Sequence, residues 1–182
     1  MILEKLKRSP KDKFLYILAI AGFLIVLLVE IFVFLPIEAV VPTYGILDYE
    51  FAWNTANVLI IFLTWGLSGI NSQVIAIYWD FLFIVGYVFL AFSLIVLALR
   101  KSGEKIQAFG KYFPITAILT GVFDVIENSL LLTMANNPGN ITSSLPLIAS
   151  LSATIKFGLL FAGIIYFVIA LIIIIINKIK KK

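Results

Sequence analysis

The 182-residue chain contains no cysteine and no histidine. These absences exclude disulfides, thiolate nucleophiles, imidazole bases, haem ligation by histidine and zinc sites of the usual ligand type. Charged residues are scarce as well, at 13% of the sequence. Any chemistry must therefore depend on carboxylates, lysine, hydroxyl groups or amides, and we expect no cofactor and no metal site.

Apolar side chains are abundant instead, and hydrophobic residues make up 62% of the chain. Such a sequence cannot fold as a soluble globule without exposing a large apolar surface to water, so lipid must be its solvent. Each crossing of a hydrocarbon core about 30 Å thick needs roughly 20 apolar residues. We therefore predict an all-α integral membrane protein, a bundle of four transmembrane helices, with one membrane domain over residues 1–182.

Four apolar segments are long enough to span a bilayer, and we place them at about 14–35, 74–99, 113–134 and 147–176. A cleaved signal peptide is the alternative for the first segment, because its leading region would also be basic. The apolar run is longer than the roughly 7–15 residues of a signal-peptide core, and no small-residue cleavage site follows closely. The first segment is therefore expected to be a retained span.

Basic residues lie in short runs beside these segments. Of the 14 lysines and arginines, five precede the first span, four lie between the second and third spans, and four close the chain. By the positive-inside rule, both termini and the 100–112 loop face the cytoplasm, and the 36–73 and 135–146 segments lie outside. We expect a multi-pass protein of the cell membrane that binds no nucleic acid.

The first outer segment contains an apolar run, at about 54–66, that is too short to cross a bilayer. Asn54 or Thr55 can cap its start and Gly66 can end it, which predicts a short helix. We expect this helix to lie in the membrane interface, above the outer mouth of the bundle.

Five ionisable side chains lie inside the predicted spans, where each charge costs about 2.5–3.5 kcal/mol on insertion scales. They are Glu30, Asp80, Asp124, Glu127 and Lys156. A helical rise of about 1.5 Å per residue places them in one layer, roughly 10 Å below the outer surface or slightly deeper. Four acids and one lysine carry a formal charge of −3. A low dielectric does not tolerate this charge unless some carboxylates hold protons or a cation enters.

Helical periodicity directs these groups toward a common interior. One face of the third span carries Thr120, Asp124, Glu127, Asn128 and Leu131. The fourth span aligns Ser152, Lys156 and Gly163, and the second aligns Gln73, Asp80 and Tyr87. These polar stripes should converge, because a polar helix face is not stable against acyl chains.

We therefore predict a charge cluster that is also the candidate ligand-binding site. Its members are Glu30, Asp80, Asp124, Glu127, Asn128 and Lys156. Lys156 is expected to pair with Glu127 or Asp124. The loop acids Asp48 and Glu50 are expected to be solvated, as acidic residues of outer loops usually are.

Four short strings resemble an uncharacterised prokaryotic family of small four-span membrane proteins, over about residues 44–170. They are Ile46-Leu-Asp-Tyr-Glu-Phe-Ala, Trp79-Asp-Phe-Leu-Phe, Asp124-Val-Ile-Glu-Asn-Ser-Leu-Leu and Thr154-Ile-Lys-Phe. This resemblance implies a shared polar core and no particular activity. The architecture is also similar to that of the sterol-isomerase and sigma-2-receptor-like (EXPERA) group. Isomerases of that group use histidine beside carboxylates, so without histidine the likeness implies only a pocket for a lipid-like amine or a sterol-like molecule.

Three functions fit these features. The first is binding or transport of a lipid-like or cationic small molecule, with Asp80, Asp124 or Glu127 as the counter-charge in an outward-facing site. The second is an intramembrane lipid-modifying enzyme with carboxylate acid/base catalysis, although no nucleophile elbow, HExxH or phosphate loop occurs. The third is a structural or accessory role in which the cluster only fixes helix register. The sequence favours the first, and leaves the ligand and the oligomeric state open.

Overall fold

The structure, a computed structural model, describes residues 2–39 and 43–180, and this part of the chain is helical with no strand. The helices in order are α1 (Ile2–Arg8), α2 (Asp12–Val29), the π-helical turn η1 (Glu30–Phe34), α3 (Leu35–Glu38), α4 (Ile46–Glu50), α5 (Thr55–Lys101), α6 (Glu104–Gly110), α7 (Phe113–Asn136) and α8 (Ser144–Ile179). Four helical segments are long and apolar enough to cross a membrane: Asp12–Glu38, Thr55–Lys101, Glu104–Asn136 and Ser144–Ile179. The all-α fold class and the four predicted spans are thereby confirmed as helices of spanning length.

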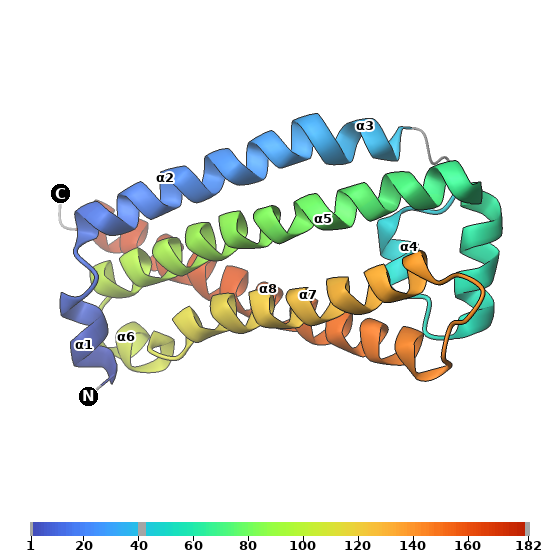
Figure 1. The fold of residues 1–182 in the computed structure, drawn as a ribbon. Helices are drawn as coiled ribbons and strands as arrows, with labels where there is room; N and C mark the ends of the chain where they lie inside the picture. Colours follow the sequence, from blue (N-terminus) through green and yellow to red (C-terminus); the bar gives the residue numbers. More distant parts are fainter. Residues whose placement is uncertain (1, 40–42, 181–182) are drawn as a thin grey trace.

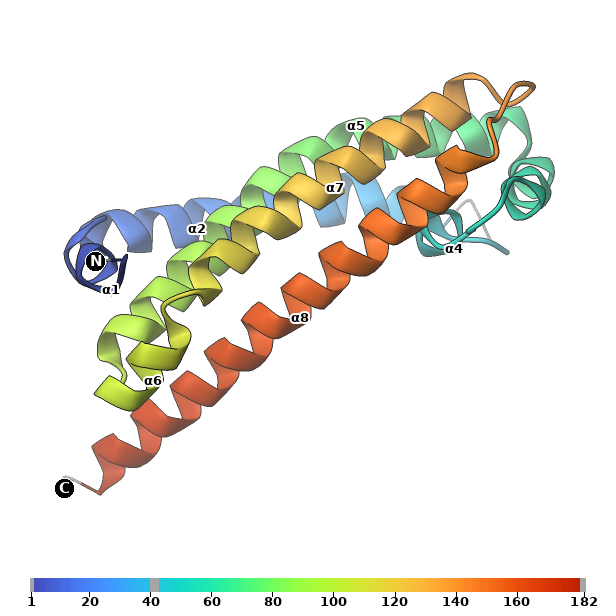
Figure 2. The same ribbon diagram turned by 90° about the horizontal axis from the view of Figure 1, so that it is seen from below.

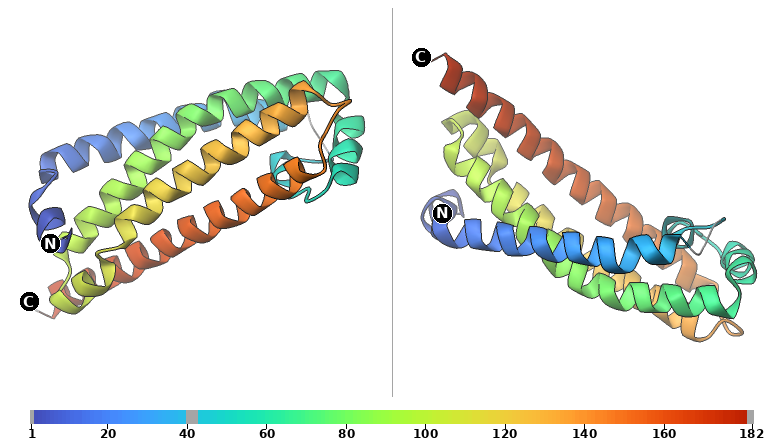
Figure 3. Two further views of the ribbon diagram at one scale, coloured as in Figure 1. Left: turned by 60° about the horizontal axis from the view of Figure 1, so that its bottom comes forward. Right: turned by 90° about the horizontal axis from the view of Figure 1, so that it is seen from above.

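Both chain ends lie at one end of the bundle, which we call the terminal end (Figure 1). The opposite end carries α4 and the first part of α5, and we call it the loop end. α2 packs chiefly against α5, whereas α7 packs against both α5 and α8 (Figures 2 and 3). α2 therefore forms an edge of the bundle, and the interior lies between α5, α7 and α8.

The predicted short helix and the predicted second span join in α5. Gly66 interrupts the helix with φ 63° and ψ −179°, a conformation that is open to glycine and costly for other residues. The chain turns there, so the segment before Gly66 crosses the loop end of the bundle (Figure 1). Asn54 caps the helix start, since its Oδ1 accepts a hydrogen bond of 2.9 Å from the backbone N–H of Asn57. The location of this segment in a membrane interface stays a prediction.

Glycines allow α2 and α5 to approach closely. A Cβ added to Gly22 would collide with the carbonyl oxygen of Gly86 and lie 2.8 Å from the backbone nitrogen of Leu90. A Cβ on Gly86 would in turn lie 2.8 Å from the Ile25 side chain. Such contacts between small residues are the usual means by which helices associate in lipid, where no hydrophobic force drives them together.

The loop end is closed by α4, which is packed into the mouth of the bundle. Tyr49 is 1% exposed, and its ring lies 5.2 Å from that of Phe62 and 5.4 Å from that of Trp65. Its hydroxyl donates a hydrogen bond of 2.8 Å to the carbonyl oxygen of Leu131 in α7. These contacts hold the residue that follows, Glu50, inside the bundle.

Candidate functional site

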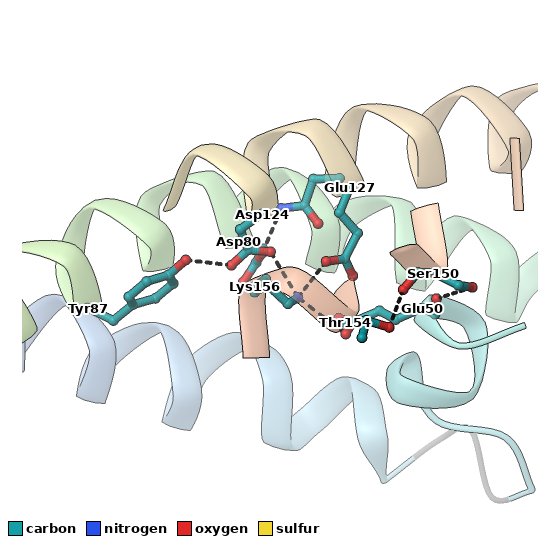
Figure 4. Close-up of polar contacts among 9 residues, drawn as sticks. Glu50, Asp80, Tyr87, Asp124, Glu127, Ser150, Thr154 and Lys156 are labelled. Atoms are coloured by element: carbon teal, nitrogen blue, oxygen red, sulfur yellow. Dashed lines mark hydrogen bonds and ion pairs between the residues drawn. The ribbon is translucent and has the colours of Figure 1, made fainter. Parts of the chain in front are cut away.

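Lys156 is the centre of a buried cluster of charges. Its Nζ lies 2.9 Å from Glu127 Oε2, 3.0 Å from Asp124 Oδ1 and 3.2 Å from Glu50 Oε2. Figure 4 shows the three carboxyl groups directed at the ammonium group. The predicted pairing of Lys156 with Glu127 or Asp124 is confirmed, since both carboxylates contact it. The cluster joins α8, α7 and the loop helix α4.

The sequence brings these groups together through simple helical geometry. Asp124 and Glu127 are three residues apart in α7, so they point to the same side of that helix. Lys156 lies about three turns after the start of α8, on the face that packs against α7. All three are buried, at 4%, 0% and 6% exposure for Asp124, Glu127 and Lys156.

Glu50 was expected to be solvated, and this expectation is wrong. The residue is 8% exposed, because α4 enters the bundle. Ser150 of α8 fixes the loop at this point: its hydroxyl donates to the Glu50 carbonyl at 2.7 Å and accepts from the Trp53 N–H at 3.0 Å. The sequence signal for this burial is weak and consists only of the apolar residues around Glu50. Asp48, by contrast, is exposed as expected.

The surroundings of Glu50 change its acidity. Burial raises the pKa of Glu50 above its ordinary value, and the negative charge of Asp124 adds to this effect. Attraction to Lys156 lowers the pKa of Glu50 but does not cancel the effect of burial. Glu50 therefore binds a proton more readily here than it would on an exposed loop.

α5 adds a second pair of polar residues to the cluster. The Tyr87 hydroxyl donates a hydrogen bond of 2.8 Å to Asp124 Oδ2, and the Asn128 amide donates one of 2.6 Å to Asp80 Oδ2. Asp80 makes no ion pair within 4.0 Å of a basic group in residues 2–39 and 43–180. The predicted convergence of the polar stripes of α5, α7 and α8 is confirmed by these contacts.

Glu30 does not belong to this cluster, contrary to prediction. It begins η1, is partly exposed, and its side chain has no hydrogen bond or ion pair with another described residue. The prediction relied on depth along the first span, and depth does not specify neighbours. α2 lies at the edge of the bundle and packs on α5, so its acid is separated from Lys156.

An apolar cavity of about 200 Å³ lies beside the cluster, on the side of the terminal end. Helices α5, α7 and α8 form its walls through Tyr87, Leu94, Ala117, Leu160, Ile164 and Phe167. Tyr87 is the residue that the cavity and the cluster share, because its hydroxyl binds Asp124. On the other side of the cluster, α4 covers Lys156. The cavity thus adjoins the cluster on the side of the terminal end, whereas an outward-facing site at the loop end was expected.

Docking of α4 gives a testable prediction. Ser150→Ala removes the hydroxyl that bridges two backbone groups of the loop, and the free energy of unfolding should fall by about 1–2 kcal/mol. The loop should also become more sensitive to protease. The matched control is Ser129→Ala, since the Ser129 hydroxyl is exposed and bonds only the carbonyl of Val125 in its own helix. Equal losses in the two variants would contradict the docking role of Ser150.

Comparison of the chain with protein-family models, curated proteins and solved structures found no match. The resemblances drawn from the sequence therefore stay predictions. In the described part of the chain, no group of three or more acidic side chains is placed to hold a metal ion. Lys156 itself occupies the centre between the three carboxyl groups, so the cluster is arranged around an ammonium group.

Proposed function

We propose that this protein is a multi-pass protein of the cell membrane, with both termini in the cytoplasm, that binds or transports a lipid-like small molecule with a cationic head. One observation carries the proposal: an apolar cavity ends at Tyr87, whose hydroxyl is bonded to Asp124 of the charge cluster. Ligand sites typically have apolar walls and a few polar groups that fix orientation. An apolar chain in the cavity would direct its head toward the carboxylates.

The charge of the cluster supports a cationic head group. Four acids and one lysine, which are Glu50, Asp80, Asp124, Glu127 and Lys156, have a formal charge of −3. Asp80 lies seven residues before Tyr87, and this spacing places both on one face of α5. An ammonium group that enters beside Tyr87 would therefore meet a carboxylate that has no lysine or arginine partner in the described chain.

A purely structural role explains this excess of acids less well. A network that only fixes helix register needs balanced pairs, and each additional buried charge lowers stability without adding a contact. A site that accepts a cation, in contrast, requires uncompensated negative charge. The surplus of carboxylates is thus the feature that favours ligand binding.

The test is equilibrium binding of a radiolabelled long-chain primary alkylamine to the protein in lipid nanodiscs. The alcohol of equal chain length serves as the competitor that lacks the charge. We expect saturable binding of the amine and at least about tenfold weaker competition by the alcohol, equivalent to about 1.4 kcal/mol. Absence of saturable binding, or equal competition by the alcohol, would overturn the proposal.

Two adjacent substitutions localise the bound chain. Ile164 and Ile165 are similarly exposed, at 46% and 58%, but only Ile164 lines the cavity. Ile164→Trp should narrow the cavity and weaken amine binding about tenfold or more, and Ile165→Trp should leave it unchanged. Equal effects of both substitutions would place the bound amine elsewhere.

A further inference from the structure

The acids of the cluster differ in how well they are hydrogen-bonded. Asp124 accepts from Lys156 through Oδ1 and from Tyr87 through Oδ2. Glu50 accepts from Lys156 at 3.2 Å, and Asp80 accepts from the Asn128 amide. Each of these three acids therefore accepts at least one hydrogen bond, and a hydrogen bond to a carboxylate favours its ionised form.

Glu127 is bonded less completely than these acids. Its side chain is 0% exposed, and its Oε2 lies 2.9 Å from Lys156 Nζ as an ion pair. Its other carboxyl oxygen, Oε1, has no hydrogen-bond partner among the described residues. Lys156 has three N–H groups, and it shares them among three acids. A fully buried carboxylate with an unsatisfied oxygen is unfavourable by several kcal/mol in the ionised form.

The charged groups around Glu127 come from every element packed against it. They are Lys156 of α8, Glu50 of α4, Asp124 of α7 and Asp80 of α5. The hydroxyl of Tyr87, also in α5, is titratable as well and is bonded to Asp124. Lys156 supplies the one positive charge among them. Lys156 compensates the charge of one ionised carboxylate. A second and a third ionised carboxylate beside it would each add an uncompensated negative charge.

We propose that Glu127 is a proton-binding site within the bundle, and that its proton leaves when a cationic head group enters. The exchange balances in charge: the carboxylic acid becomes a carboxylate and a released proton, and the ammonium group of the ligand replaces that positive charge. The second half of this inference rests on the proposed function. The first half, the proton on Glu127, does not.

Infrared spectroscopy tests the proton directly and needs no ligand. The wild-type protein in nanodiscs should show a C=O stretching band of a protonated carboxylic acid that shifts in D₂O. Glu127→Gln should remove this band, and Asp124→Asn should retain it. A wild-type spectrum without the band, or a band that survives in Glu127→Gln, would overturn the proton site. Failure of Glu127→Gln to fold would also overturn it, because glutamine has the shape and the charge of a protonated glutamate.

The pH dependence of alkylamine binding tests the exchange. Displacement of one proton makes wild-type affinity rise about tenfold per pH unit over the range in which Glu127 is protonated. In Glu127→Gln the affinity should be independent of pH. Saturable binding with a flat wild-type profile would reject the exchange and leave the proposed function intact. A Glu127 band without any saturable binding would reject the proposed function and leave the proton site.

Discussion

Lys156→Met is expected to lower the free energy of unfolding by about 3–5 kcal/mol, which is the usual cost of removing one partner of a buried ion pair. The substitution leaves Glu50, Asp124 and Glu127 facing one another without a positive charge. Methionine fills a similar volume, so the loss reflects charge and not packing. Thermal unfolding in detergent, followed by circular dichroism, measures the change.

Two further variants separate this effect from a general loss of lysine. Lys178→Met removes an exposed lysine of the same helix and should leave stability unchanged. Adding Asp124→Asn to Lys156→Met removes one of the unpaired charges and should restore part of the lost stability, as expected for residues in direct contact. If Lys156→Met were as stable as Lys178→Met, the ion pairs around Lys156 would not form.

Gly22→Leu is expected to separate α2 from α5. A Cβ at this position already meets the backbone of α5, at Gly86 and Leu90, and backbone cannot move aside as a flexible side chain can. Overpacking of a core costs about 1–3 kcal/mol, and we expect a loss at the upper end of this range. The readout is thermal unfolding, together with new protease cleavage between α2 and α4.

Gly158→Leu is the matched control for this substitution. Gly158 lies in the middle of α8, and a Cβ there would meet no atom of another helix within 4 Å. The same change of glycine to leucine in a spanning helix should thus be neutral or stabilising, since leucine favours the helix. Similar losses from both substitutions would show that the α2–α5 contact does not depend on Gly22.

The sequence was sufficient to predict most of the fold, because the signals involved are local. Runs of apolar residues specify the four long helices, and the i, i+3, i+4 spacing of polar residues in α7 specifies the face that carries Asp124 and Glu127. Pairing with Lys156 then follows from charge alone. Gly66 was also informative, since its conformational freedom ends one helical segment and redirects the next.

Two residues could not be placed from the sequence, because their surroundings do not depend on local signals. Burial of Glu50 depends on tertiary packing, in which Tyr49 and Ser150 draw a polar loop into the bundle. Exclusion of Glu30 depends on which helices are neighbours, and the depth of a residue along its own helix does not contain that information. Both errors concern contacts between segments that are far apart in the chain.

Together these contacts make the loop helix α4 part of the site. It covers the cluster at the loop end and supplies one of the three carboxylates on Lys156, while the apolar cavity opens on the other side. A ligand in the cavity and a proton on Glu127 would both change the charge around the ammonium group of Lys156. The arrangement of α4 is thus the feature on which the site depends.

Chemical cross-linking tests this arrangement most directly, because the chain has no cysteine of its own. Phe51 and Phe157 directly follow Glu50 and Lys156, and their rings stack with centroids 5.7 Å apart. In native membranes, Phe51→Cys/Phe157→Cys should be joined efficiently by a short bifunctional thiol reagent. Phe51→Cys/Ile172→Cys, with the second site about 22 Å further along α8, should not. Equal yields from the two pairs, or no cross-link at Phe157, would contradict the insertion of α4 beside Lys156.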